Sequence, residues 1–173
     1  MNDQNNSGLT TDQCQRLAGF LEQAWAANRV TIDNVTVLSG GAIQENLAVS
    51  VTVVGGDYAG DHDVVLRTDA PTQVAVSLDR LQEFKVLQLA FDTGLTVPKP
   101  IVACADMGVI CRPFVIMGMI GGLAPGHKLV KLPVLEAKPD ALVGQLGQQL
   151  ARLHQITPTA EARQRLDFLP VPK

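Results

Sequence analysis

The sequence predicts an α+β fold, in which a mainly antiparallel sheet of about five strands is packed with helices and followed by further helices. Apolar and polar residues alternate between Asn46 and Val54, which is the period of a half-buried strand. Leucines recur at helical spacing before and after the expected strands. With 46% hydrophobic residues, the 173-residue chain can form a real core, made mostly of aliphatic side chains because only 4% are aromatic.

Charge and composition argue against several classes of protein. A net charge of -3 provides no broad basic surface, so nucleic acid is not expected as the main partner. The longest apolar run, Phe114 to Pro125, is too short to span a bilayer, and no membrane partner is expected. The polar N-terminus does not resemble a signal peptide. We therefore expect a cytoplasmic protein with reduced cysteines, and a Cys104–Cys111 disulfide is the less favoured alternative.

A first helix is expected from Thr10 or Thr11 to about Asn28. Gln13 completes a capping box on Thr10, which marks the start of the helix. A lone tryptophan on an apolar helix face is usually an anchor in the core. The residues on that face are Leu17, Phe20, Leu21, Ala24 and Trp25.

Three strands are expected after this helix. The first ends at the glycine turn of residues 39–41, and the second begins at Asn46. Glycines between residues 55 and 61 predict a hairpin loop. The third strand, Val64 to Leu66, places the cation Arg67 at its end.

A second helix is predicted from about Val74 to Ala90, ended by Gly94. Its apolar positions indicate one buried side and its charged positions a solvated side. The expected buried residues are Leu78, Leu81, Phe84 and Leu87, and the expected polar residues are Asp79, Arg80, Glu83 and Lys85.

The remaining elements are a short strand, a turn, a last strand and a final long helix. The strand Ile101–Cys104 leads through a turn at 106–108 to the last strand, Val109–Met117. Pro113 in that strand indicates an edge position or a bulge near its start. A helix from Asp140 to His154 carries an apolar stripe. The stripe consists of Leu142, Leu146, Leu150 and Leu153.

A glycine-rich segment, residues 118–126, is the best candidate for a hinge. It divides the chain into an expected small domain of residues 1–117 and the start of a second domain at residues 127–173. A glycine loop between two strands and a cation on the next strand can together clamp a polyphosphate. Taken singly, a Ser-Gly-Gly loop is more often a plain turn, and Arg67 a solvated residue. Glu83 has two candidate partners, Arg67 and Arg80.

The order of these features is that of a kinase small lobe. The chain resembles the aminoglycoside phosphotransferase and choline kinase-like superfamily, whose members share the protein-kinase fold, and it is most similar to the broad bacterial and acyl-CoA-dehydrogenase-associated branch. The resemblance covers about Val30 to Ile156, the N-terminal part of such a protein. The matching segments are L-S-G-G-A-I-Q-E-N, V-V-L-R, L-Q-E-F-K-V-L, L-T-V-P-K-P-I-V-A-C, R-P-F-V-I-M-G-M-I-G-G and Q-L-A-R-L-H-Q-I.

The resemblance implies nucleotide-binding roles for several residues. Arg67 would contact the phosphates, with Glu83 as its ion-pair partner, and Met117 would be the gatekeeper beside the adenine. The residues expected over the ATP phosphates are Ser39, Gly40, Gly41, Ala42, Ile43 and Gln44. The backbone expected to meet adenine is that of Gly118, Met119 and Ile120.

Two parts of the family's active site are missing from this sequence. The family requires an H-G-D-x-x-x-x-N loop and a later metal-binding Asp, yet none of His62, His127 and His154 is followed by Gly-Asp. In 167–169, Leu replaces the Gly of a D-F-G motif. No catalytic residue and no metal ligand is therefore assigned. ATP, Mg²⁺ and a small hydroxylated acceptor are expected for the full-length family member. This chain is expected to be its truncated, inactive N-terminal part.

Two alternatives remain open at this point. The chain can be a natural short module that binds nucleotide or a partner without catalysis, or a complete small enzyme with other chemistry. The apolar stripe of the 142–153 helix is expected to be covered by self-association or by collapse onto the small lobe, because exposed patches of that size are unusual in monomers.

Overall fold

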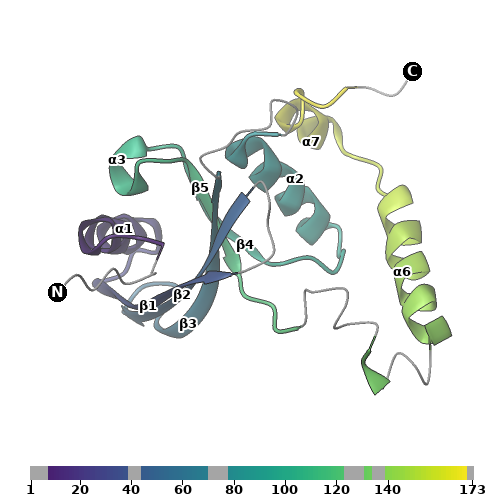
Figure 1. Ribbon diagram of the computed structural model, residues 1–173. Coiled ribbons are helices and arrows are strands. Elements are labelled where there is room, and N and C mark those ends of the chain that lie inside the picture. Colours follow the sequence, from purple (N-terminus) through teal and green to yellow (C-terminus); the bar gives the residue numbers. More distant parts are fainter. Residues whose placement is uncertain (1–7, 39–43, 70–77, 123–130, 134–138, 171–173) are drawn as a thin grey trace. The chain divides into compact units, whose positions relative to one another are not determined.

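The computed structural model describes residues 8–38, 44–69, 78–122, 131–133 and 139–170 (Figure 1). The chain forms two compact units. The first unit comprises residues 1–84 and 100–119 and contains the whole sheet. The second comprises residues 85–99 and 120–173.

The first unit is built on a five-stranded sheet in the order β1-β2-β3-β5-β4. Every neighbouring pair of strands is antiparallel. The predicted α+β class with a five-stranded sheet is thus confirmed. The strands are β1 (Arg29–Leu38), β2 (Gln44–Val54), β3 (Gly60–Asp69), β4 (Pro100–Cys104) and β5 (Phe114–Gly118).

One face of the sheet forms the core with α1 (Thr11–Ala24), which packs against β1 and α3 (Met107–Ile110). Figure 1 shows α1 and α3 on the same side of the sheet. The alternation predicted for β2 is confirmed, since Val49, Val51 and Val53 are all buried in this core.

The N-terminal end of α1 has the predicted capping box. The Thr10 hydroxyl accepts a hydrogen bond from the Gln13 backbone at 3.2 Å, and the Gln13 side chain accepts one from the Thr10 backbone at 2.9 Å. These bonds satisfy backbone groups that the helix itself leaves without partners.

The other end of α1 is anchored by Trp25. This residue is 2% exposed, and its ring stacks on Tyr58 with 5.0 Å between ring centroids. The helix stops before the predicted end at Asn28, because Ala26 takes a positive φ of 50° and breaks the helical backbone. Ala24, predicted on the buried face, is exposed.

The glycine cluster after β2 forms the predicted hairpin loop to β3. Gly55 and Gly56 have φ of 75° and 73°, in the left-handed region that glycine adopts without steric cost. The Asp57 amide donates to the Trp25 carbonyl at 3.2 Å, which ties the loop to the end of α1.

The helix α2 (Arg80–Asp92) buries a different side chain from those predicted. Leu78 precedes the helix and is 36% exposed. The other three predicted positions, Leu81, Phe84 and Leu87, are only half-buried, whereas Arg80 is 2% exposed. Residues 74–77 of the predicted helix lie outside the described residues.

The segment before β5 also differs from the prediction. The expected turn at 106–108 is the start of α3, whose N-cap Asp106 accepts from the Gly108 backbone at 2.7 Å. Val109 and Ile110 belong to this helix rather than to the last strand. Cys111 then takes a left-handed conformation with φ of 64°, which ends the helix.

The strand β5 begins only after Pro113, and it lies between β3 and β4. An edge position, one of the two alternatives predicted from Pro113, is therefore wrong for this strand. Pro113 stands outside the ladder, where its missing N–H costs nothing. The edge strand on this side is β4.

The second unit contains α6 (Pro139–His154) and α7 (Ala160–Arg165). The prediction of a helix to His154 is confirmed, and α7, capped by Thr159, was not predicted. Of the apolar stripe, Leu146, Leu150 and Leu153 are 62%, 53% and 48% exposed in the single chain. Self-association through this stripe stays a prediction. The candidate hinge at residues 118–126 is described only as far as 122.

No helix within the described ranges is long and apolar enough to cross a membrane. All three cysteines are free thiols, as expected. Cys104 is buried, Cys14 is half-buried and Cys111 is exposed.

Candidate functional site

Arg67 lies on the face of the sheet opposite the α1 core. Its neighbours Leu66 and Thr68 are both fully buried, so the alternation of a strand directs Arg67 to the other face. The register places Asn46 directly opposite Arg67 on β2 and Val115 opposite it on β5. Arg67 thus stands on the central strand with a partner strand on each side.

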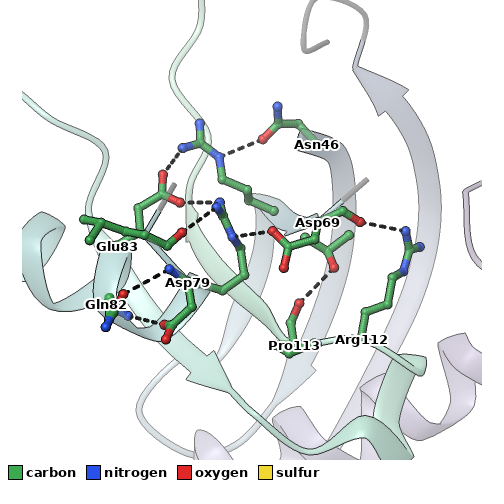
Figure 2. Close-up of polar contacts among 11 residues, drawn as sticks. Asn46, Asp69, Asp79, Gln82, Glu83, Arg112 and Pro113 are labelled. Carbon is green, nitrogen blue, oxygen red and sulfur yellow. Dashed lines mark hydrogen bonds and ion pairs between the residues drawn. The ribbon is translucent and has the colours of Figure 1, made fainter. Parts of the chain in front are cut away.

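Two side chains hold the Arg67 guanidinium (Figure 2). The Arg67 Nε donates to Asn46 Oδ1 at 2.9 Å, and Nη1 forms an ion pair with Glu83 Oε1 on α2. The Arg67 side chain is 29% exposed. Among the described residues, Nη2 has no hydrogen-bond partner, so one edge of the guanidinium is free to bind an anion there.

Glu83 binds two arginines, where the sequence left a choice between them. Its second oxygen, Oε2, pairs with Nη1 of Arg80 in the preceding helical turn. The Nε of Arg80 lies 2.9 Å from Asp69 Oδ1 at the end of β3, and its Nη2 donates to the Leu78 carbonyl at 3.2 Å. The Arg80 side chain is 1% exposed, and these acidic partners offset the cost of burying its charge.

A third arginine, Arg112, adds contacts at the end of β3. Arg112 Nη1 donates to Glu45 Oε2 at 2.7 Å and to the Asp69 carbonyl at 3.1 Å. Residues of opposite charge therefore follow one another from Arg67 on β3 through α2 to Asp69 at the end of β3, and from the Asp69 backbone carbonyl through Arg112 to Glu45 on β2. We refer to them as the charge chain, and in order they are Arg67, Glu83, Arg80, Asp69, Arg112 and Glu45.

The expected adenine-side residues lie in part on the same face. Met117 is 5% exposed and pairs with Val65, two residues before Arg67 on β3. Gly118 is the last residue of β5, and the Met119 amide donates to the Asp63 carbonyl at 3.3 Å. The structure brings Arg67, Glu83, Met117 and Gly118 into one unit. Their roles as nucleotide contacts stay predictions.

The other expected nucleotide-binding residues are described only in part. Ser39 to Ile43 lie outside the described residues, and Gln44 is the first residue of β2, in register with Asp69. Ile120 belongs to the second unit and is 61% exposed.

The residues present fit a phosphate group better than a metal ion. Arg67 offers a partly exposed guanidinium edge, which matches the geometry of phosphate oxygens. In the described part of the chain, no three His, Cys, Asp or Glu side chains are grouped so that they could hold a metal ion. No described residue is therefore assigned as a Mg²⁺ ligand.

Comparison with known proteins identifies a family. The profile of the phosphotransferase enzyme family matches residues 34–170. Acyl-CoA dehydrogenase family member 11 of Pongo abelii is 36% identical over 101 residues, which make up 56% of this chain and 12% of that protein. The chain thus spans about an eighth of that relative's length.

A solved structure is also similar. It is that of a Ralstonia eutropha protein provisionally named an aminoglycoside phosphotransferase, 20% identical, with a TM-score of 0.45 over 65% of this chain and 31% of the other. The family profile alone covers more than half of the 173 residues. The chain therefore belongs to the phosphotransferase enzyme family.

Proposed function

We propose that this chain provides the part of a phosphotransferase site that binds the nucleotide phosphates. The complete enzyme would transfer a phosphate from ATP to a hydroxyl of a small molecule. In this role Arg67 binds a phosphate oxygen through the guanidinium edge that Asn46 and Glu83 leave free. That arrangement is the single observation that supports the proposal most strongly.

The chemistry of phosphoryl transfer explains why such an arrangement is useful. The protein contributes mainly by positioning the reactants and by neutralising charge on the phosphates. A guanidinium fixed on two sides keeps its orientation before the ligand arrives, so little ordering is needed on binding. Arg67 can provide this charge neutralisation without any proton transfer, because arginine stays protonated at neutral pH.

We further propose that these 173 residues do not catalyse transfer by themselves. The sequence contains no His-Gly-Asp segment to orient an acceptor hydroxyl, and the described residues supply no metal cluster. We therefore expect this chain to bind ATP without turning it over.

Calorimetric titration of the purified chain with ATP tests the binding claim. Wild type should bind, and Arg67→Met should lose at least about 1.5 kcal/mol of binding free energy, the worth of a charge-assisted hydrogen bond. Arg29→Met is the matched control, because Arg29 is exposed at the start of β1. Equal affinity of the two variants would refute the role of Arg67. Turnover of Mg·ATP with hydroxylated acceptors should be absent, and its presence would refute the second claim.

A further inference from the structure

We propose that Arg80 is a positioning residue for phosphate binding, although it touches no ligand itself. Its buried guanidinium fixes Glu83 and balances the acidic charge beside Arg67, which leaves Arg67 available for an anion. This inference rests on the proposed function, since it assigns Arg67 to the nucleotide phosphates.

The position of Arg80 explains how it can act through another residue. It is the first residue of α2, and its ion pairs join Asp69 at the end of β3 to Glu83 one turn along the helix. A guanidinium presents its donors in a rigid planar fork, so the two carboxylates are held in fixed directions. Because the Arg80 side chain is 1% exposed, this anchor is shielded from solvent.

The Glu83 side chain would be poorly oriented without this anchor. Its side chain is 26% exposed, and a glutamate with one partner near the surface keeps much of its rotamer freedom. With Oε2 bound to Arg80, Oε1 is directed to Arg67. The orientation of Arg67 therefore depends on a residue that lies on another element.

Charge balance gives Arg80 a second effect on anion binding. Arg67 and Arg80 together neutralise Asp69 and Glu83, so the four side chains carry no net charge. Removal of the Arg80 charge would leave two carboxylates beside a single cation. The surplus negative charge would repel a phosphate.

The test compares ATP affinity in wild type, Arg80→Met and the double variant Arg80→Met/Asp69→Asn. Arg80→Met should bind ATP about tenfold more weakly, and the double variant should regain part of this loss because the charge balance is restored. Arg16→Met is the matched control, since Arg16 also makes an ion pair, to Asp12, and a bond to a backbone carbonyl, but on α1. A purely structural role for Arg80 predicts no recovery in the double variant.

A second measurement does not depend on nucleotide. The Nε–H of Arg67 donates to Asn46, so its hydrogen exchange in NMR spectra reports how firmly Arg67 is held. We expect exchange at least about fivefold faster in Arg80→Met than in wild type. If wild type fails to bind ATP, the proposed function is refuted, and this exchange rate alone decides the positioning claim. Unchanged exchange would overturn that claim.

Arg80→Lys covers the case in which Arg80→Met does not fold. Lysine keeps the charge but is a single point donor that cannot bridge both carboxylates in a fork. It should preserve the charge balance while speeding the exchange of the Arg67 Nε–H. Wild-type exchange and wild-type ATP affinity in folded Arg80→Lys would refute the claim that the guanidinium fork positions Glu83.

Discussion

Asn46 and Arg67 face each other across β2 and β3, and the Arg67 Nε donates to Asn46 Oδ1 at 2.9 Å. Asn46 follows closely on the glycine-rich segment of residues 39–44, which is expected over the ATP phosphates. The strand that leaves this segment therefore also carries the side chain that orients Arg67.

This relationship predicts that Asn46→Asp weakens ATP binding while changing the stability of the fold very little. The new carboxylate would pair with Arg67 and change the free energy of unfolding by no more than about 1 kcal/mol, because the pair is partly exposed. It would also compete with a phosphate, so ATP affinity should fall about tenfold. Denaturant unfolding and calorimetry measure the two effects, with Asn34→Asp on β1 as the control. Unchanged ATP affinity in Asn46→Asp would contradict the prediction.

The hairpin loop between β2 and β3 predicts an unequal effect of two similar substitutions. Gly56→Ala and Gly94→Ala both place a side chain at positive φ, of 73° and 79°. A Cβ on Gly56 would lie 2.7 Å from the Ala26 carbonyl oxygen and even closer to that of Trp25, whereas no atom of the described residues lies within 4 Å of one on Gly94. We expect Gly94→Ala to lower the free energy of unfolding by about 1–2 kcal/mol, and Gly56→Ala to lower it by about 3 kcal/mol or more. Equal losses of unfolding free energy, measured by denaturant unfolding, would contradict this prediction. They would show that the loop relaxes to accommodate the added side chain.

Association through α6 is expected to depend on its apolar stripe. Wild type should form concentration-dependent oligomers in sedimentation velocity, because Leu146 and Leu150 are both more than half exposed. Leu146→Gln/Leu150→Gln should be monomeric. Ala151→Gln changes an exposed residue off the stripe and should sediment as wild type does. A wild-type chain that stays monomeric at every concentration would refute this association.

The three cysteines should be alkylated at different rates, in an order set by their burial. Burial raises the pKa of the Cys14 thiol. Burial also raises the pKa of the Cys104 thiol, a hydrogen bond with the Asp106 backbone partly lowers it, and the Asp106 charge raises it further. The thiolate is the reactive form, so both should alkylate slowly at neutral pH and faster as the pH rises above the usual thiol range. Exposed Cys111 should alkylate first.

The same shifts have a consequence for stability. A raised pKa in the folded state means that the fold favours the neutral thiol. The stabilisation is complete below the unfolded thiol pKa of about 8.5 and is lost as the pH rises through the higher folded value. Mass spectrometry of iodoacetamide products across a pH series checks the order, and denatured chain, in which the three thiols should label alike, is the control. Cys104 reacting as fast as Cys111 at neutral pH would contradict it.

The sequence predicted those parts of the fold that depend on local patterns. The alternation around Val49, Val51 and Val53 indicated a strand with one buried face, and the capping box at Thr10 located the start of α1. The run from Val109 to Met117 was predicted as one strand because, in a short and mostly apolar run, periodicity alone does not distinguish a buried helical turn from a strand. Pro113, within that run, was the available signal for a break.

The charge chain could be predicted only in part, because its partners are distant in sequence. The resemblance pointed to Arg67 and Glu83, which lie in conspicuous motifs. Arg80 was predicted at a polar position of its helix and as one of two candidate partners of Glu83, and helical spacing does not reveal that Asp69 also lies beside it. Arg112 and Glu45 are 67 residues apart, and nothing in the local pattern of either one indicates the other.

The strand order also bears on how the sheet resists aggregation. Its two edges are β1 and β4, and an open edge can template pairing with another chain. The register of β1 shifts between Ile32 and Asn34, at the charged residue Asp33, and β4 is short and begins at Pro100. Irregularity, charge and proline are the features by which natural sheets discourage such pairing. Both edges are therefore poor templates for extending the sheet into fibres.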